Sequence, residues 1–348
     1  MSVLIDTYNH EAFIERAIRS VLDQDMPMDA VEILVVDDGS SDATPDIVRR
    51  FAPRVRLLQK SNGGQASAFN FGFAEAQGDI VATLDGDDWW APQKLRRVLE
   101  ALESNPDVGM VGHGLYEQYS DGRPNGLILP GKPYRLDLST PQNAEVFRHL
   151  AAFFGTSRLT VRQSVLRQIL PIPEELSIEA DEYIFTLAPA IAPAMILNEP
   201  LCYYGIHSGN LFQFGAFEPV KARRKMNVLD VLMRELPPRL RKLGATDEIV
   251  AAIFRGTRVE AGRIRLSLDG GSPLEAFSLE RAAFKASYQQ VTWRYRLFRG
   301  FVLLQTLLLP PRLFYRMRRW YSEKGLSRFR GWTGEPRPAV QVVERRPG

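Results

Sequence analysis

The chain has 348 residues, of which 45% are hydrophobic, so it is long and apolar enough for one to three globular domains. Cys202 is the only cysteine, which excludes a disulfide within the chain and suits a reducing compartment. The formal net charge of +3 hides an acidic body and a basic tail, because residues 281–348 contain 15 Lys and Arg but only 3 Asp and Glu. We expect this tail to contact an anionic partner, with a solvated tail as the alternative.

In chain order, the first third alternates strand-like and helix-like patterns, and no signal peptide is expected before it. Strands are predicted at residues 2–6, 32–38, 54–59, 79–85 and 108–113. Helices are predicted at residues 13–24, after Ser40 and Ser41 as caps, and at 67–76 and 92–104. This order predicts an α/β fold whose mostly parallel sheet has helices on both faces.

Polar residues follow four of these strands, at the edge where parallel sheets bind ligands. They are Asp6 to Asn9, Asp37 with Asp38, Asn62 to Gly64, and Asp85 to Asp88. We therefore predict a single site at the carboxyl ends of the strands.

The remaining sequence is less regular. Residues 158–161 predict a strand, 179–191 a helix, and 194–197 and 201–207 two short strands. Helical patterns dominate from about 216 to 324. We expect an α/β domain at 1–215, a basic helical extension at 216–330 and a loose tail at 331–348.

The stretch VATLDGDDWW places Asp85, Asp87 and Asp88 at a strand end. Such carboxylates repel one another unless a hard cation such as Mg²⁺ or Mn²⁺ binds them, although a solvated acidic turn is the simpler alternative. Trp89 and Trp90 either floor a sugar site or pack under the sheet.

Two further motifs suit a nucleotide. In VVDDGSSD, Asp37 and Asp38 can accept hydrogen bonds from a base or ribose, or acids there simply start a helix. In NGGQASAFNFG, backbone N–H groups can face phosphate, although the glycine spacing matches neither the P-loop nor the dinucleotide fingerprint.

SVLIDTYNHEAFIERAIRSVLDQ, VVDDGSSD, NGGQASAFNFG and GDIVATLDGDDWW occur in an order that resembles the family 2 glycosyltransferases, which have the GT-A fold. The resemblance covers about Ser2 to Phe214. It implies an inverting enzyme that transfers a sugar (a hexosyl group) from a nucleotide diphosphate donor, usually a UDP-sugar, to a hydroxyl in cell-surface polysaccharide synthesis.

The resemblance also assigns roles to residues. The nucleotide would be held by Thr7, Tyr8, Asn9, Asp37, Asn62, Gly63 and Gln65. Asp85 would approach ribose or the metal, Asp87 would bind Mn²⁺ or Mg²⁺ directly, and Asp88 would support them. His207, in YYGIHSGN, matches the late histidine that can ligate the metal; a structural histidine is the alternative.

An inverting transfer needs a general base for the acceptor hydroxyl. PEELSIEADEYIFTLA is similar to the region that carries it, which assigns Asp181, with Glu182 in reserve. Acids that merely open a helix are the alternative. Two residues depart from the family pattern. Ala180 replaces a Glu. Asp6 replaces a Pro, and its side chain either faces solvent or alters the choice of donor.

Residues 295–324 combine arginines, aromatic residues and an apolar run. Only 12 uncharged residues separate Arg299 from Arg312, too few for a membrane span. We predict two helices separated at Pro310 and Pro311 that anchor a cytoplasmic protein peripherally on an anionic membrane surface. A helical hairpin packed on the catalytic domain, or a surface for another partner, is the alternative.

The predicted partners are a nucleotide-sugar donor and a glycan or lipid-linked acceptor. Three other functions are weighed against transfer: a non-catalytic sugar-nucleotide binder, which the Ala180 departure favours, a phosphoryl-transfer domain, and nucleic-acid binding by the basic tail. We favour none of these, and expect no nucleic-acid partner.

Overall fold

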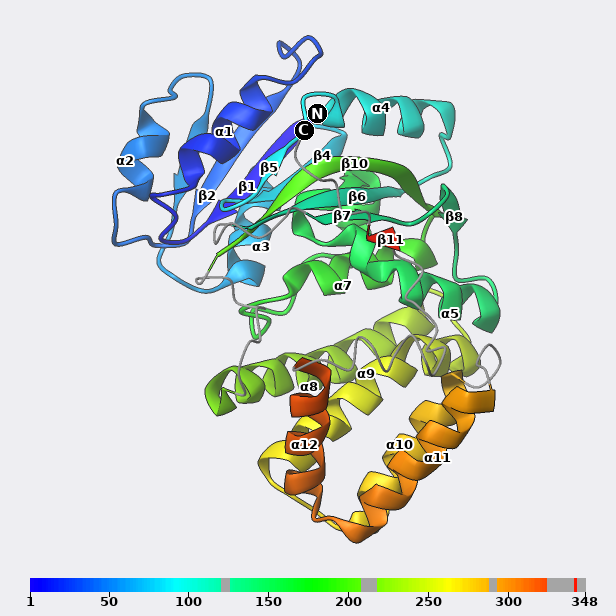
Figure 1. Cartoon of the computed structure of the whole chain (residues 1–348). Coiled ribbons are helices and arrows are strands. Elements are labelled where there is room, and N and C mark those ends of the chain that lie inside the picture. The colour runs from blue at the N-terminus through cyan, green and yellow to red at the C-terminus, as the bar shows by residue number, and fades with distance from the viewer. Residues whose placement is uncertain (120–125, 208–217, 288–292, 324–340, 343–348) are drawn as a thin grey trace, which may run out of the picture. The chain divides into compact units, whose positions relative to one another are not determined.

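The computed structural model describes residues 1–119, 126–207, 218–287, 293–323 and 341–342 (Figure 1). The chain divides into two compact units. The first, called the α/β unit, comprises Met1–Asn210, Arg234–Ala252 and Ala339–Gly348. The second, called the helical unit, comprises Leu211–Met233 and Ile253–Pro338. The predicted domain limits at 215 and 330 stay predictions.

The α/β unit is built on one sheet. Its strands are β1 (Ser2–Thr7), β2 (Glu32–Asp37), β3 (Arg56–Gln59), β4 (Ile80–Asp85), β5 (Trp89–Trp90), β6 (Met110–Tyr119), β7 (Gly126–Leu129), β8 (Tyr134–Leu136), β9 (Thr160–Arg162), β10 (Ala194–Ile206) and β11 (Gln341–Val342). Their order is β11-β7-β6-β9-β4-β1-β2-β3, and β10 pairs with β5, β6 and β8. Strands β4, β1, β2 and β3 are parallel neighbours, as are β10 and β6, whereas β9 runs antiparallel between β4 and β6. The predicted mostly parallel α/β sheet is therefore confirmed.

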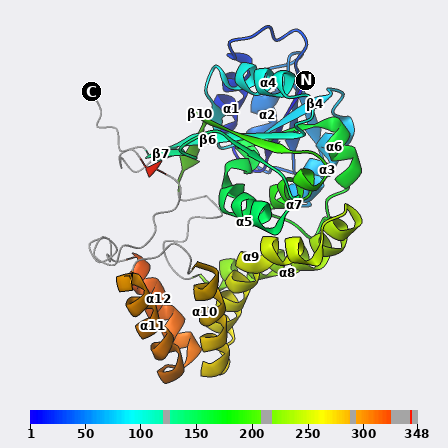
Figure 2. The ribbon, with the colours of Figure 1, turned by 90° about the vertical axis from the view of Figure 1, so that its right-hand side faces the viewer.

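Helices cover both faces of this sheet (Figure 2). They are α1 (Ile14–Leu22), α2 (Thr44–Arg49), α3 (Gln65–Glu75), α4 (Lys94–Ser104), α5 (Pro141–Leu150), α6 (Gln163–Ile169) and α7 (Ala180–Leu187), with short 3₁₀ turns at Ala151–Phe154, Thr156–Arg158 and Ala188–Ala190. Figure 2 shows α1, α2 and α4 on one face and α3, α5, α6 and α7 on the other. Both faces of the central strands are thus buried, which explains their continuous apolar sequences.

The packing of α1 and α3 shows how the sequence directs each helix to its face. In α1, Ile14, Ala17, Ile18 and Val21 recur at helical spacing, and all four are buried. On the other face, Gly72 of α3 lies against Leu4, because an added Cβ would fall 2.2 Å from a methyl carbon of that leucine. The glycine therefore allows α3 to lie close to β1.

The expected serine cap of α2 is wrong. The helix begins at Thr44 without a side-chain cap on the preceding residue. Ser40 and Ser41 instead contact the loop after β1: the Asn9 N–H donates to Ser40 Oγ at 2.8 Å, and the Ser41 N–H donates to Asn9 Oδ1 at 2.8 Å. The two serines therefore join the ends of β1 and β2.

The helical unit takes part of α8 (Pro219–Lys242) and α9 (Asp247–Leu268), together with α10 (Pro273–Ser287), α11 (Trp293–Leu308) and α12 (Pro311–Glu323). The predicted separation at Pro310 and Pro311 is confirmed, since α11 ends just before these prolines and α12 begins at the second. Glu280 is fully buried and pairs with Arg263 at 2.8 Å and Arg318 at 2.5 Å, which joins α9, α10 and α12. Over the described residues, no helix has the length and hydropathy needed to cross a bilayer.

Candidate functional site

The strand register brings the predicted polar residues to one edge. Asp6 of β1 pairs in register with Asp85 of β4, and Thr7 pairs with Asp37 of β2. Because these strands are parallel, their carboxyl ends lie side by side. The edge they form is the candidate site.

Asp88, the last acid of the stretch Asp85–Asp88, is held by hydrogen bonds within the fold. Its Oδ1 accepts a hydrogen bond from the Gly205 N–H at 2.8 Å, and its Oδ2 accepts one from Ser157 Oγ at 2.5 Å. Burial and the neighbouring Asp87 raise the pKa of Asp88 to about 8. Both oxygens are engaged, so Asp88 ties the turn after β4 to β10.

Asp87 meets the predicted histidine. The Nε2 atom of His207 lies 3.2 Å from Asp87 Oδ2, and the imidazole stacks on Phe13 with ring centroids 4.4 Å apart. Burial acts to raise the pKa of Asp87, but the hydrogen bond from His207 and the charges of His10 and His207 hold it below its usual value. Asp87 is therefore ionised at neutral pH.

Asp87 and His207 are close enough to bind the same cation. Over the described ranges, no group of three His, Cys, Asp or Glu side chains is arranged to hold a metal by itself. Mg²⁺ is usually bound by one or two carboxylates, with substrate phosphates and water in the other positions. The Asp87 carboxylate fits that arrangement, and a neutral His207 imidazole can add a nitrogen ligand for a cation that accepts one.

Gln65 links Asp85 to the start of α7. Its Nε2 donates to Asp85 Oδ1 at 3.4 Å and to Thr156 Oγ1 at 3.2 Å. Its Oε1 accepts from the Ala180 N–H at 2.9 Å. Burial and the nearby carboxylates, Asp6 first, raise the pKa of Asp85 well above its usual value.

Asp6 lies next to Asp85 in the sheet and is only partly exposed to solvent. Its Oδ1 is buried and has no hydrogen-bond partner among the residues that the structure describes. Burial first, and then the charge of Asp87, raise its pKa to about 8. The residue that departs from the family pattern therefore adds a further acid to the site.

Asp181 lies on the same network. Its Oδ2 accepts from the Thr156 N–H at 2.9 Å and from Thr156 Oγ1 at 3.2 Å, its Oδ1 accepts from the Glu182 N–H at 2.9 Å, and the residue is partly exposed. Burial and the charge of Glu182 raise its pKa. Glu182 is engaged elsewhere, because Arg148 donates to it at 2.8 Å. Asp85, Gln65, Thr156 and Asp181 thus form a continuous chain of contacts.

Asp37 and Asp38 are both buried beneath the glycine-containing loop. Asp38 accepts from the N–H of Gly63 at 3.0 Å and of Gly64 at 2.7 Å, and pairs with Lys60 at 2.7 Å. Asp37 accepts from the Ser40 N–H at 3.0 Å and from Gln59 Nε2 at 3.1 Å. Asp38 therefore positions the loop.

The loop after β1 supplies the other side of the edge. Thr7 is buried, Tyr8 is 47% exposed, and Asn9 has a left-handed φ of 54°. Asn62 donates through Nδ2 to the Asp38 carbonyl at 3.0 Å. The predicted nucleotide residues thus gather around the ends of β1 and β2.

Sequence reasoning gave no role to two nearby rings. His10 lies 3.3 Å from Thr7 Oγ1 through Nδ1, and Phe13 stacks on His207. Burial lowers the pKa of His10. Both residues fall inside the first motif, TYNHEAF, so their proximity to the site was the available signal.

The two tryptophans differ. Trp90 is 2% exposed, donates through Nε1 to the Ser157 carbonyl at 2.8 Å and lies under the Lys94 ammonium, which is 3.6 Å from the ring centroid. Trp90 therefore packs within the fold. Trp89 is partly exposed and stacks on Tyr203, with the Arg16 guanidinium 3.4 Å from its ring centroid.

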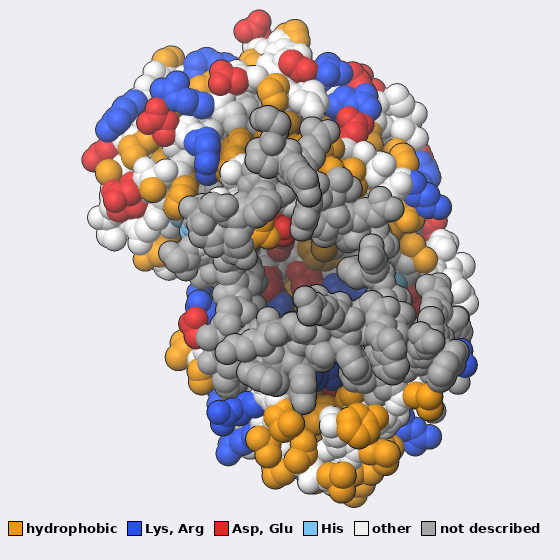
Figure 3. Space-filling view, in the orientation of Figure 1, with side chains coloured by type: hydrophobic (Ala, Val, Ile, Leu, Met, Phe, Trp, Pro, Cys, Tyr) orange, Lys and Arg blue, Asp and Glu red, His pale blue; other side chains and the backbone are white. Residues whose placement is uncertain are grey.

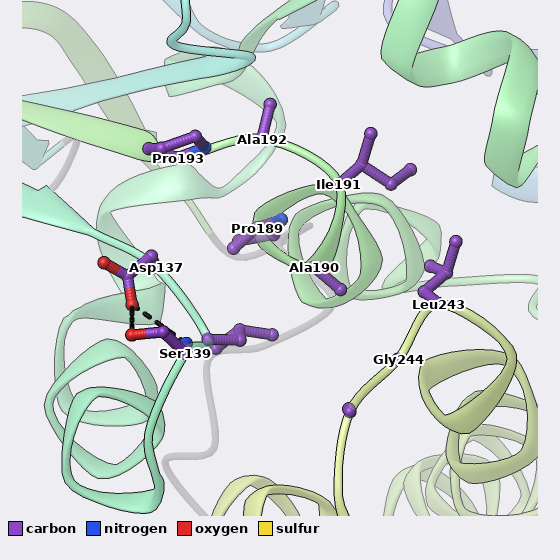
Figure 4. Close-up of a pocket in the computed structure, with 11 residues that line it drawn as sticks. Asp137, Ser139, Pro189, Ala190, Ile191, Ala192, Pro193, Leu243 and Gly244 are labelled. Atoms are coloured by element: carbon purple, nitrogen blue, oxygen red, sulfur yellow. Dashed lines mark hydrogen bonds between the residues drawn. The ribbon is translucent and has the colours of Figure 1, made fainter.

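A hollow lies elsewhere in the α/β unit (Figure 4). It is lined by the segment 189–193, which precedes β10, by residues that follow β8 and by residues 243–245. Because β10 begins after this segment, the hollow is at the opposite end of the strands from the carboxylates. Its acid, Asp137, already accepts hydrogen bonds from Ser139 and Asn143. This hollow is separate from the candidate site.

Comparison with known proteins agrees with this geometry. Residues 2–170 match the model of the family described as "Glycosyl transferase family 2". An uncharacterized glycosyltransferase of Nostoc sp. is 35% identical over 225 residues, which cover 60% of this chain and 66% of the relative. The chain spans 43% to 66% of the length of three curated relatives.

Solved structures show the same fold. The Staphylococcus aureus protein TarS (residues 1–349, with UDP-GlcNAc) is 19% identical, with a TM-score of 0.58 over 92% of this chain and 91% of that chain. The mannosyltransferase PcManGT from Pyrobaculum calidifontis, with GDP-Man and Mn²⁺, is 20% identical, with a TM-score of 0.50 over 93% and 87%. The predicted GT-A fold is confirmed, and over residues 2–170 this chain is a member of glycosyl transferase family 2.

Proposed function

We propose that the chain is an inverting glycosyltransferase, which moves a sugar from a nucleotide diphosphate donor, a UDP-sugar, to an acceptor hydroxyl in cell-surface glycan synthesis. The observation that carries the proposal is the placement of the Asp87–His207 pair and Asp181 on one edge, joined through Asp85 and Gln65. A donor site and a base are the two parts that such a transfer needs.

In this proposal, Asp87 and His207 hold Mn²⁺ or Mg²⁺, with Asp85 beside the metal or the ribose. The cation, when bound, stabilises negative charge on the departing diphosphate. Two protein ligands leave coordination positions for phosphate oxygens, and the neighbour from P. calidifontis contains Mn²⁺ with its GDP-sugar.

Asp181 is the proposed general base. Its raised pKa makes the carboxylate a better proton acceptor than an ordinary aspartate, and its partial exposure leaves it open to an acceptor hydroxyl. The Thr156 N–H holds Oδ2 in place at 2.9 Å. Glu182 is less suited to this role because it already pairs with Arg148.

The base and ribose of the donor are proposed to lie against Thr7, Tyr8, Asn9, Asp37, Asn62 and Gly63. Exposed Tyr8 offers a stacking surface, and Asp37 supplies a carboxylate at the end of β2. Asp38 contributes through the loop that it positions.

The partners are proposed to be a nucleotide-sugar donor and a glycan or lipid-linked acceptor, used at the cytoplasmic face of a membrane. A Bacillus subtilis relative, TuaG, is named for teichuronic acid biosynthesis and is 37% identical over 129 residues, which cover 36% of this chain and 50% of the relative. Its name supports a surface glycan as the product class. We assign transfer to residues 1–215, and attachment to the basic helices within 216–330.

Donor turnover tests the proposal. The chain is incubated with UDP-sugars and Mn²⁺, and release of UDP is followed with and without acceptor extracts. Metal-dependent release that rises with acceptor supports transfer. UDP binding without release by any sugar nucleotide would instead indicate a non-catalytic binder, the function that the Ala180 departure favours.

A further inference from the structure

One face of α11 presents apolar side chains to solvent. Leu297, Phe301, Leu304 and Leu308 are 65%, 60%, 60% and 80% exposed. At roughly 100° per residue, these positions fall within about 60° of one another around the helix. These four residues are called the α11 stripe below.

The opposite face of α11 packs within the helical unit. Thr306 is fully buried there, and Val302 and Leu309 pack against the cluster that contains Leu266 and Phe314. The helix is therefore apolar on both faces, and its own unit covers only one. Contiguous exposed apolar residues, unlike scattered ones, mark a contact surface.

Exposed basic side chains lie on the next helix, α12. Arg312, Leu313 and Arg316 are exposed. Arg312 donates to the carbonyls of Leu268 and Asp269 at 3.1 Å, whereas Arg316 forms no ion pair within the part of the chain that the structure describes. Residues 293–323 contain seven arginines and one glutamate. Figure 3 shows hydrophobic side chains gathered on this part of the helical unit, with Lys and Arg beside them.

We propose that the α11 stripe, together with the exposed Arg316 of α12, docks the chain on an anionic phospholipid surface. A partner must match both apolar side chains and positive charge, and an anionic bilayer supplies acyl chains directly beneath negative headgroups. A second copy using the same face would bring like charges together, and a nucleic acid would leave the stripe exposed. The inference rests on the attachment proposed above for the helices within 216–330, to which it gives a surface and a partner, and it does not depend on the transfer reaction.

Vesicle co-sedimentation of the full chain tests this. The probes are phosphatidylcholine vesicles, alone or mixed in equal parts with phosphatidylglycerol. We expect binding to be at least about tenfold tighter on the anionic vesicles and to weaken as salt is added. The double change Phe301→Gln and Leu304→Gln should weaken it by about tenfold or more.

The matched control is Val220→Gln, which changes an apolar residue that is 82% exposed on α8 and should alter binding less than about twofold. Arg316→Gln should weaken binding to anionic vesicles by about fivefold and leave the weak binding to neutral ones unchanged. Circular dichroism and thermal melting establish that each variant folds.

Equal binding to both vesicle types, or no effect of either stripe substitution, would overturn the proposal. So would sedimentation-velocity dimers that the double variant abolishes in the absence of vesicle binding, because the partner would then be a second copy. UDP titration of the same variants should match wild type, so failure of this inference is distinguishable from failure of the proposed transfer reaction.

Discussion

The candidate site and the α11 stripe are opposite departures from ordinary folding. At the site, acids such as Asp6 and Asp85, each only partly exposed, are held close to one another, whereas on α11 leucines are exposed to water. Each arrangement costs stability in the free protein, since buried like charges repel and exposed apolar surface stays hydrated. The two proposals give each arrangement a different kind of partner: a cation with a diphosphate for the acids, and a lipid surface for the stripe.

The largest expected effect is on the reaction itself. Asp181→Asn removes the proposed base but keeps the shape of the side chain, so kcat should fall by about 10² to 10⁴-fold. UDP affinity, measured by calorimetry, should change by less than about threefold because Asp181 is not a proposed nucleotide ligand.

Glu182→Gln is the matched control, because Glu182 is next in sequence but pairs with Arg148. It should retain kcat within about tenfold of wild type. If the Glu182→Gln variant is less active than the Asp181→Asn variant, Glu182 and not Asp181 is the general base.

The buried Glu280 of the helical unit differs from the acids of the site, because its charge is paired with two arginines. Glu280→Gln leaves Arg263 and Arg318 without their carboxylate, which should lower the free energy of unfolding by about 3–5 kcal/mol. Chemical denaturation measures the loss. Glu275→Gln, at an exposed pair on the same helix, should leave the denaturation midpoint nearly unchanged, because solvent screens this pair. Equal losses would mean that burial does not set the strength of these pairs.

Asp6, whose Oδ1 has no hydrogen-bond partner among the described residues, gives a prediction of how stability changes with pH. Its folded pKa of about 8 exceeds the unfolded value of about 3.9, so the folded state keeps a proton that the unfolded chain releases. Stability without metal should therefore fall as pH rises from about 4 to about 8. Asp6→Asn should flatten this decline and raise the melting temperature at pH 8 by about 4 °C or more.

The exposed change Asp29→Asn is the control and should leave the pH profile of wild type unchanged. Melting temperatures of the three proteins from pH 5 to pH 8 in EDTA provide the comparison. A profile of Asp6→Asn that is parallel to wild type would show that Asp6 is not the group that takes up the proton.

The edge of the sheet that forms the candidate site was predictable from the sequence, because parallel strands place their carboxyl ends together. Short motifs were therefore sufficient to place Asp37, Asp85 and Asp87 at that edge. Asp181 and His207 lie far along the chain from these motifs, so only the family resemblance linked them to the same site. The support from Ser157 to Asp88 was not predictable, because it joins residues 69 positions apart through a 3₁₀ turn. Which face of α11 remains exposed was equally unpredictable from the sequence, since the helix is apolar on both sides.

Calorimetric titration of UDP tests the central claim most directly. Wild type is titrated with Mn²⁺ and with EDTA, and Asp87→Ala with Mn²⁺, with Asp46→Ala, an exposed acid on α2, as the control. The account predicts Mn²⁺-dependent binding that weakens by about tenfold or more in Asp87→Ala and is unchanged in the control. UDP binding of equal strength in EDTA, or in Asp87→Ala, would contradict a metal-assisted donor site at the end of β4.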